Sequence, residues 1–500
     1  MKQVLFFLLT LIFLSCSDNQ PQINLDEIVK KANAPLLKGL GNHSFKISSN
    51  IEGTQEYFDQ GLIMTFAFNH AESVRSFRAA QRLDPNCAIC FWGEALALGP
   101  NINVTSDGKA VMSPENRRDA LKAFKIAESL KEGASSKEKD FIEALKTRYN
   151  GNPETSRVDL DLNYAQSMEL LYRKYPNDTD AASLYAEALM ITMPWNYWAE
   201  DGNPKPDTVK VISTLEKVLE LDKNHPLAIH LYIHAVEASS DPGRAESAAD
   251  RLGKLVPGAG HLVHMPSHIY WRVGRYKDAS LANIEAAKVD EDYIAQCNAQ
   301  GFYPALYYPH NIHFLWAAST MEGKSALSIE SALKVSSYVS EEQIRSVPFL
   351  EFFHTPPLLS YVRFGKWEEI LNYEKPIEDP FQDLYNDIAN GLLAERARRS
   401  RDQLLNIKTV ASLKFAADLA PIAFGDYLGA SSNGELTISQ LPASNDSMMT
   451  RVKRIKEQEY LFVDTLDDYY SRFHREMRPS YDEWRHATYD EAIRLREVER

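Results

Sequence analysis

The chain has 500 residues, of which 44% are hydrophobic, so it can bury a large core and is not expected to be disordered. Its 55 basic and 69 acidic residues give a formal net charge of -14. No lysine- or arginine-rich stripe is long enough to neutralise a row of phosphates, and nucleic acid is therefore not an expected partner.

The N-terminal stretch MKQVLFFLLTLIFLSC combines a lysine, an apolar run from Val4 to Leu14 and a Ser15-Cys16 pair. It resembles the signal of bacterial lipoproteins, in which cleavage leaves the cysteine as a lipid-modified first residue. The run is short for a bilayer span, which favours an export segment (residues 1–16) over the alternative, an uncleaved anchor or buried helix. The resemblance implies lipidation at Cys16, a membrane partner, and a bacterial outer-membrane lipoprotein that faces the periplasm or the cell surface.

After a lead-in over residues 17–55, a helix-turn-helix signature begins at Tyr57. Gly61 and Ala80 are small residues for a helix crossing, Phe77 is a large plug, and Pro85 ends the second helix. These positions resemble the tetratricopeptide repeat family. The resemblance implies an all-α fold, a right-handed α-solenoid of paired helices over residues 56–424, and a binding scaffold more often than an enzyme.

Later copies of the pattern keep the same spacing. Each has a glycine at the expected turn between its paired helices: Gly243, Gly274, Gly323 and Gly365. We expect eight units between Glu56 and about Tyr373 and a further helical pair from Phe381 to about Ala420. Insertions follow at Gly99 to Lys109 and at Pro194 to Pro206, and in solenoids such insertions favour the binding face. Residues 425–447 are predicted to form a loop, and residues 448–500 a helical C-terminal cap.

Cys87-Ala-Ile-Cys90 is a C-x-x-C motif in an expected exported protein. A redox motif of this kind needs a βαβ setting, and the surroundings here are helical. The sequence therefore favours a small disulfide staple or two packed thiols, with Cys297 left without an obvious partner.

Eight of the 13 histidines lie between His225 and His313, a window of 89 residues. In the tetratricopeptide family, each repeat unit can be numbered so that the glycine of its turn is position 15. Positions 2, 5 and 9 of the helix before that turn then face the concave groove. The residues that fall on or beside these positions are His230, His234, Glu237, His261, His264, His268, His310 and His313. Adjacent units can bring them together. Pro266 complicates this phase, because the helix must either kink there or begin there.

The same groove is expected to include Asp180, Glu187, Trp195, Trp198, Asn311 and His354. The remaining histidines, His43, His70, His225, His474 and His486, are interpreted as ordinary surface or core residues.

Three interpretations of the cluster remain open. The first is a transition-metal site for zinc, copper or iron, since imidazoles and a carboxylate are suitable ligands. The second is a metal-free groove for a protein, peptide, glycan or small molecule. The third is a set of histidines that only hydrogen-bond between helices.

The sequence names no reaction. His230, His234 and Glu237 form H-x-x-x-H-x-x-E, which differs from the H-E-x-x-H of zinc proteases because the glutamate is not between the histidines. If the protein is an enzyme, metal-assisted hydrolysis or oxidation with Glu237 or Glu187 as proton acceptor is the expected chemistry. The main expectation is an exported, lipid-anchored solenoid that binds a ligand through a metal ion in a His/Glu-lined groove.

Overall fold

The computed structural model describes residues 25–104, 112–151, 156–199, 201–299, 301–346, 350, 353–366 and 369. Every regular element in these ranges is helical, and their β-type pairings are two isolated bridges, Asn101 with Val104 and Trp198 with Pro204. The prediction of an all-α fold is confirmed for this part of the chain. No helix in it is long and apolar enough to cross a membrane.

The helices of the first half are α1 (Leu25–Ala32), α2 (Thr54–Phe66), α3 (His70–Leu83), α4 (Ala88–Leu98), α5 (Pro114–Leu130), η1 (Lys131–Gly133), α6 (Ser136–Lys146), α7 (Arg157–Lys174), α8 (Thr179–Thr192) and α9 (Pro206–Leu221). Those that follow are α10 (Pro226–Val236), η2 (Pro242–Ala245), α11 (Glu246–Leu255), α12 (Gly260–His264), α13 (Pro266–Arg272), α14 (Tyr276–Cys297), η3 (Tyr303–Tyr307), α15 (Tyr308–Met321), α16 (Ser325–Tyr338), α17 (Glu341–Ser346) and α18 (Pro356–Arg363).

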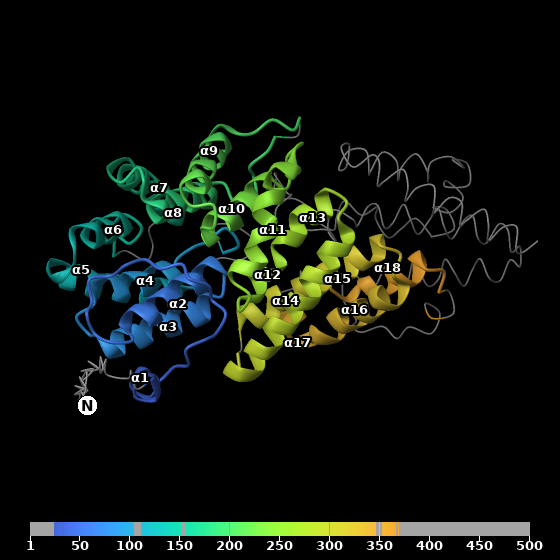
Figure 1. The fold of residues 1–500 in the computed structure, drawn as a ribbon, viewed down its shortest axis with the longest axis horizontal. Coiled ribbons are helices and arrows are strands. Elements are labelled where there is room, and N and C mark those ends of the chain that lie inside the picture. Colours follow the sequence, from blue (N-terminus) through green and yellow to red (C-terminus); the bar gives the residue numbers. More distant parts are fainter. Residues whose placement is uncertain are drawn as a thin grey trace, which may run out of the picture.

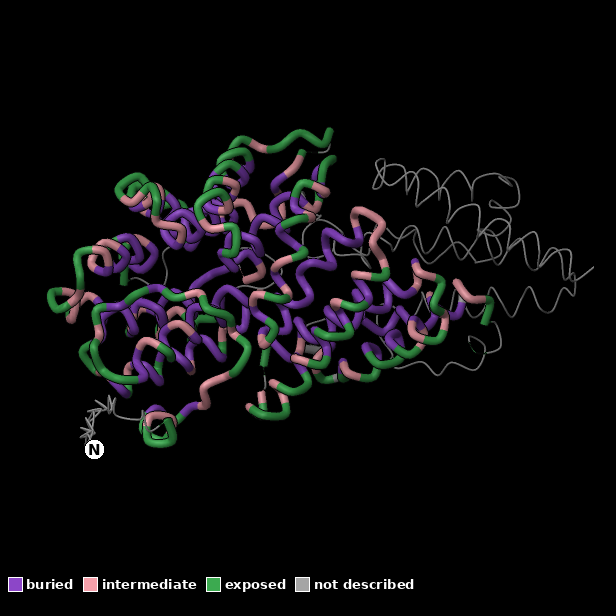
Figure 2. Tube along the Cα trace, in the orientation of Figure 1, coloured by how far each residue is buried: buried purple, intermediate pink, exposed green. Residues whose placement is uncertain are grey.

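The helices follow one another along the long axis of the molecule, broadly in chain order (Figure 1). Helices α2 to α6 lie toward one end, α15, α16 and α18 lie toward the other, and α10 to α14 lie between them (Figure 1). Buried segments run through the interior, while the exposed ones are mostly outer turns and outward helix faces (Figure 2). Helices α10, α12 and α13, which carry five of the clustered histidines, thus lie at the centre of the described fold, and α15 packs against α12 beside them.

Glycines mark several of the turns that the sequence predicts. Gly274 separates α13 from α14, Gly323 separates α15 from α16, and Gly365 follows α18, all with positive φ (81°, 72° and 65°). Only glycine adopts this region at little cost, which explains its use there. Gly243 differs, because it lies inside the short helix η2 rather than in an open turn.

The contact between α2, α3 and α4 depends on two glycines that face one aromatic ring. A Cβ added to Gly61 would lie 2.8 Å from the Phe77 ring, and one added to Gly93 would lie 2.3 Å from it. Phe77 is fully buried, so the ring fills the space that the two glycines leave. The predicted small residue and plug at this crossing are confirmed, and the sequence analysis missed Gly93.

Cys87 and Cys90 form a disulfide with an S–S distance of 2.00 Å at the start of α4. The staple, one of the two alternatives left open for this motif, is therefore correct. Cys297 is outside any disulfide in the described chain.

The lead-in packs against the helices that follow it. The Leu37 backbone N–H donates to Gln60 Oε1 on α2 (2.7 Å), and the Gly258 N–H donates to the Gly39 carbonyl (2.8 Å). Several predicted features lie outside the described residues: the export segment 1–16 with Cys16, the helical pair from Phe381, the loop 425–447, the cap 448–500, His474 and His486.

Candidate metal centre

Helix α10 supplies the first histidines of the centre. His230 and His234 are four residues apart, so their side chains leave the same face of the helix, and Glu237 follows as its C-terminal cap. Pro226 occupies the first turn of α10, where its missing N–H costs nothing.

Pro266 does not separate the histidines around it. His261 and His264 lie on α12, His268 lies on α13, and Met265 between them has right-handed helical angles (φ -50°, ψ -37°). The chain thus stays helical across the proline, and His264 and His268 remain one turn apart. A new helix begins at Pro266, as one of the two alternatives expected. The earlier histidines nevertheless lie on a helix and not on an incoming loop.

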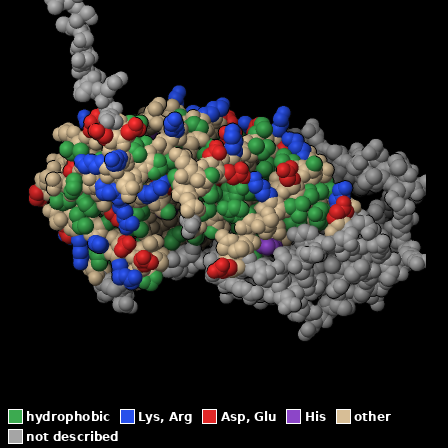
Figure 3. Space-filling view, turned by 90° about the horizontal axis from the view of Figure 1, so that it is seen from below, with side chains coloured by type: hydrophobic (Ala, Val, Ile, Leu, Met, Phe, Trp, Pro, Cys, Tyr) green, Lys and Arg blue, Asp and Glu red, His purple; other side chains and the backbone are tan. Residues whose placement is uncertain are grey.

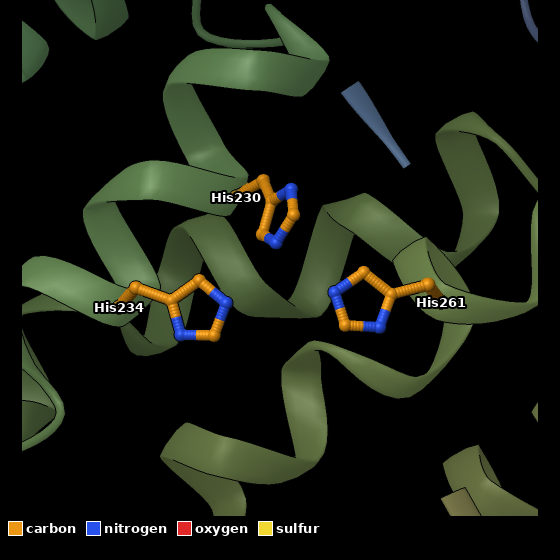
Figure 4. Close-up of side chains that lie close together, drawn as sticks. All are labelled: His230, His234 and His261. Atoms are coloured by element: carbon orange, nitrogen blue, oxygen red, sulfur yellow. The ribbon is translucent and has the colours of Figure 1, made fainter. Parts of the chain in front are cut away.

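The first three-histidine group contains His230, His234 and His261, with one nitrogen of each ring within 4.8 Å of the others. Figure 4 shows the three rings turned toward a common space, two from α10 and one from α12. His230 Nδ1 is 2.6 Å from the Phe66 carbonyl and therefore carries the proton of the neutral ring. Its Nε2 is left with a lone pair, and that atom is buried without a hydrogen-bond partner.

The other two rings of this group also have unpartnered nitrogens. His234 Nδ1 donates to Glu237 Oε1 (2.9 Å), while its Nε2 is buried and unpaired. Both ring nitrogens of His261 are buried and unpaired. Buried polar atoms nearly always have partners, and these nitrogens, gathered around one point, could hold a metal ion.

The second three-histidine group contains His264, His268 and His310. Asn283 Nδ2 donates to the Ala279 carbonyl (2.8 Å), which turns Asn283 Oδ1 toward His264 Nδ1 at 2.6 Å. His264 Nδ1 must therefore donate and carry the proton, with the Ser267 hydroxyl 3.3 Å away as a second acceptor.

His268 is fixed in the same tautomer. Its Nδ1 donates to Glu237 Oε2 at 2.5 Å, which leaves the lone pair on Nε2. The Nε2 atoms of His264 and His268 face each other at 2.9 Å. Two lone pairs at this distance repel unless a proton or a metal ion lies between them. Burial, with the neighbouring His268, holds the pKa of His264 well below its ordinary value. The contact is either a hydrogen bond between the two rings or a place where a metal ion could bind both.

Glu237 connects the two groups. One carboxylate oxygen accepts from His234 in the first group, and the other accepts from His268 in the second. Burial acts to raise the pKa of Glu237, but the electrostatic attraction of His268 and the bonds from both histidines outweigh it and hold the pKa well below its usual range. The carboxylate is thus ionised, and it orients two imidazoles as acceptors do around metal ligands.

Each group is covered by one phenylalanine. The Phe68 ring centroid lies 4.4 Å from that of His230 and 5.4 Å from that of His261. Phe314, one turn after His310 on α15, lies 4.5 to 5.0 Å from the three rings of the second group. Phe68 has a positive φ of 55°, which is costly for a bulky residue. These rings make the surroundings of the lone pairs apolar.

The pKa of the buried imidazoles favours the neutral form that a metal needs. Burial, with neighbouring imidazoles adding to it, holds the pKa well below its ordinary value in His230, His261 and His310 as in His264. Burial also lowers the pKa of His234, against the bond to Glu237. Lone pairs are therefore available at neutral pH.

A third group, His43, Asp180 and His225, joins two histidines that the sequence analysis had interpreted as ordinary. His225 Nδ1 accepts the Ala228 N–H (3.3 Å) as the cap of α10, so its proton is on Nε2, which donates to Asp180 Oδ1 (3.2 Å). His43 Nε2 is 2.9 Å from the same oxygen. With that proton committed, His225 has no Nε2 lone pair for a metal, and we interpret this group as a structural hydrogen-bond network. His43 lies far from Asp180 and His225 in the sequence, and no signal in the sequence indicates that it joins this group.

Some of the remaining predicted residues contact the two groups, and others lie away from them. The Trp195 ring packs edge-on against His234 (4.8 Å), and Trp198 Nε1 donates to the Ala235 carbonyl (2.9 Å). Asn311 donates to Asp290 Oδ2 (2.7 Å). His313 packs on Trp316 and Phe353, and it is in none of the groups; His354 bonds to the Val339 carbonyl (2.8 Å) away from them.

The expectation of an open, histidine-lined groove is wrong for these side chains. The six histidines of the two groups are at most 4% exposed, and only the side chain of Glu237 reaches partial exposure, at 18%. On the face in Figure 3, histidine is visible at one small spot where the described residues are uncovered. The phase that places the rings together also turns them inward, against α2, α14 and the phenylalanines, instead of toward solvent.

No family model matches the chain, and no curated protein is similar enough to be matched with it. The chemistry of the site has therefore to be argued from the side chains themselves.

Proposed function

We propose that the protein binds transition-metal ions through the two buried three-histidine groups. The observation that carries this proposal is the pair of Nε2 atoms of His264 and His268, 2.9 Å apart, on rings whose Nδ1 protons are both committed elsewhere. A metal bound to both nitrogens at 2.0 to 2.1 Å would need them about 3.3 Å apart, a small adjustment. Zinc, copper and iron are the metals that imidazole ligands suit.

The surroundings of the groups support the same proposal. Four of the six rings have an acceptor that fixes the tautomer with the lone pair toward the centre, and for three of them it is the Phe66 carbonyl (His230) or Glu237 (His234 and His268). Asn283 does the same for His264. Metal-ligating histidines generally have such partners, whereas histidines that merely join helices use both nitrogens for hydrogen bonds.

Elemental analysis of protein purified without a histidine tag tests the proposal. We expect about one equivalent or more of a transition metal, either as isolated or after reconstitution, and its loss in His268→Ala. His43→Gln, from the third group, is the matched control and should retain the metal. Less than about 0.3 equivalents after reconstitution, or equal metal in wild type and His268→Ala, would refute it.

The proposed setting is a tetratricopeptide-type solenoid anchored in the bacterial cell envelope. Support comes from the paired packing of successive helices such as α2 with α3 and α15 with α16, from the Gly61–Phe77 crossing, and from the lipoprotein-like segment that ends at Cys16. Fractionation of cells that express Cys16→Ala tests the anchor. The variant should leave the membrane fraction in which the natural chain is found, and equal membrane association of the two chains would refute it.

A second candidate function is metal-dependent hydrolysis or oxidation at the same centre. Glu187 is buried, and burial raises its pKa to about 7 against the charge of Arg148, so it can take up a proton near neutral pH. Glu237 is less suited as the proton acceptor, because both its oxygens already accept hydrogen bonds from imidazole N–H groups. In assays of nitrophenyl ester cleavage and of oxygen uptake with ascorbate, Glu187→Gln should lose activity while it keeps its metal. Unchanged turnover in the variant would exclude this role.

The metal-free groove for a peptide or glycan has less support, because the histidines and most of the aromatic residues assigned to it are buried. It becomes the better interpretation if no metal binds.

A further inference from the structure

We infer that the centre holds two copper ions in the monovalent state, one in each three-histidine group. The inference rests on the proposed metal binding and specifies its stoichiometry and its metal. It follows from how the ligands are divided, from the charge that the site can neutralise and from what surrounds it.

The six histidines fall into two sets of three. A further group of possible ligands, His234, Glu237 and His268, takes one histidine from each set. His230, His234 and His261 share no member with the second group, His264, His268 and His310. The sets are nevertheless adjacent, because the ring centroids of His234 and His268 are 5.2 Å apart and those of His261 and His264 are 5.6 Å apart. One ion can use three or four of these nitrogens, and the other set would then keep its lone pairs buried and unpaired.

Glu237 supports the same division. Its two oxygens bond to Nδ1 of one histidine in each set, at 2.9 Å and 2.5 Å. If only one ion were bound, half of this arrangement would orient an imidazole toward no ligand. A single carboxylate behind both sets is what two neighbouring ions would share.

The charge of the site selects a monovalent metal. An imidazole that binds a metal ion through its lone pair is neutral, and Glu237 is the one carboxylate that bonds to these rings among the described residues. Two divalent ions would leave a net charge of about +3 in a largely buried site, while two monovalent ions would leave about +1, and uncompensated buried charge is strongly unfavourable. Among metals that bind imidazole, copper has a stable monovalent state, and that state accepts three nitrogen ligands.

The two phenylalanine rings that cover the groups also favour monovalent copper. Phe68 lies against the first set and Phe314 against the second, within 4.4 to 5.4 Å of the rings they touch. Apolar rings beside the histidines offer no hydrogen bond to a fourth ligand such as water or hydroxide. Divalent zinc with three histidines normally keeps such a ligand, whereas three-coordinate monovalent copper does not.

Anaerobic titration of untagged protein with Cu(I), in competition with the chromophoric chelator bathocuproine disulfonate, tests the inference. We expect two Cu(I) per chain in the wild type, one in His261→Gln, one in His310→Gln, and none in the double variant. Circular dichroism confirms that the variants fold, and His43→Gln is the control that keeps two. X-ray absorption of the wild type, which depends on no variant, should give three nitrogen neighbours per copper.

The possible failures are distinguishable from one another. One copper per chain, or the loss of both ions in either single variant, would overturn the pair while leaving the proposed metal binding intact. Two zinc ions with no uptake of Cu(I) would overturn the monovalent assignment alone. The absence of any metal after reconstitution would refute both the inference and the proposed function.

Discussion

Glu237 is the residue on which the geometry of both histidine groups depends. Its two oxygens accept protons from His234 and His268, so each ring presents Nε2 to the centre. A glutamine in its place could accept only one of these protons, because its amide N–H₂ would oppose the other Nδ1–H.

We therefore expect Glu237→Gln to weaken metal binding by about 10- to 100-fold, the usual effect of removing such a partner. The measurement is a competition titration of the variant and the wild type with the same chelator. Glu220→Gln, an exposed glutamate paired with Lys217, is the matched control and should bind as the wild type does. An affinity in Glu237→Gln within threefold of the wild type would contradict this role.

The pair formed by His43 and Asp180 makes stability depend on pH. Burial acts to lower the pKa of His43, but its bond to Asp180 and the charge of that carboxylate raise it above its ordinary value. Burial acts to raise the pKa of Asp180, yet its bonds to His225 and His43 hold it well below its usual range. The stabilisation is complete between about pH 4 and 6.5 and is lost as pH rises through the raised pKa of His43.

His43→Gln should accordingly lose about 1 to 3 kcal/mol of unfolding free energy at pH 5.5 and clearly less at pH 9, since a charge-assisted bond becomes a neutral one. Urea unfolding of wild type and variant at the two pH values gives the comparison. A loss that is equal at both, or larger at pH 9, would show that His43 is not charged in the folded protein.

Residue by residue, the sequence predicted the ligands better than their partners. The spacing of His230 and His234, and of His264 and His268, is visible in the chain because α10 carries the first pair and the backbone stays helical from α12 to α13 across the second. Phe66, Phe68 and Asn283 have no such signal, since they are ordinary residues of α2, the α2–α3 turn and α14 that only the packing brings to the rings.

At the scale of elements, the α2–α3–α4 contact depends on the absence of side chains at Gly61 and Gly93. Alanine normally stabilises a helix relative to glycine, but here its Cβ would lie 2.8 Å from the Phe77 ring at position 61. Gly61→Ala should therefore destabilise the protein by about 1 to 3 kcal/mol, the range for overpacking a dense core. The measurement is the denaturant midpoint in urea.

Two further variants make this test specific. Phe77→Leu in the Gly61→Ala background should recover part of the loss, because the shorter side chain frees space. Gly133→Ala is the control, since a Cβ there meets nothing within 4 Å, and its effect should stay within about 0.5 to 1 kcal/mol. A stabilised Gly61→Ala protein would contradict the account of this contact.

The elements themselves were largely predictable, because glycine and proline mark their ends. Gly274 and Gly323 lie at turns between helices as expected, and Pro226 and Pro309 occupy first turns. The course of the chain at Pro266 was not predictable. A proline there allows either a new helix or a kink, and the packing of α12 and α13 against α14 keeps the backbone helical across it.

At the scale of the whole molecule, the buried histidines make the metal-free protein sensitive to acid. The pKa values of His230, His261, His264 and His310 are held well below the ordinary value by burial and by one another. Below about pH 6.5 the unfolded chain takes up protons that the folded chain cannot, so stability falls as pH falls. Each such histidine contributes up to about 1.4 kcal/mol per pH unit.

Four of them are enough to remove a typical stability of 5 to 15 kcal/mol within a few pH units, so we expect the metal-free protein to unfold with a midpoint above about pH 4. Bound metal competes with these protons and should shift the midpoint lower. Far-ultraviolet circular dichroism during acid titration, with and without metal, gives both midpoints. Metal-free protein that stays folded at pH 3.5 would contradict the burial of neutral imidazoles.

The sequence could place the cluster in the molecule but not its depth. Helical phase brings residues from α10, α12, α13 and α15 to one side, whether that side faces solvent or the interior. Helix α2 and the turn that follows it decide the question, because the Phe66 carbonyl and Phe68 close over the first group. The result is an internal centre where the sequence suggested a groove.

The central claim is that each three-histidine group binds a metal ion. Anomalous scattering from crystals of untagged, metal-reconstituted protein tests it most directly. The account predicts anomalous peaks within about 2.2 Å of Nε2 of His264 and His268 in one group and of Nε2 of His230 and His234 in the other. Crystals of reconstituted protein without a peak at either group, or with the metal between His43, Asp180 and His225 instead, would contradict it.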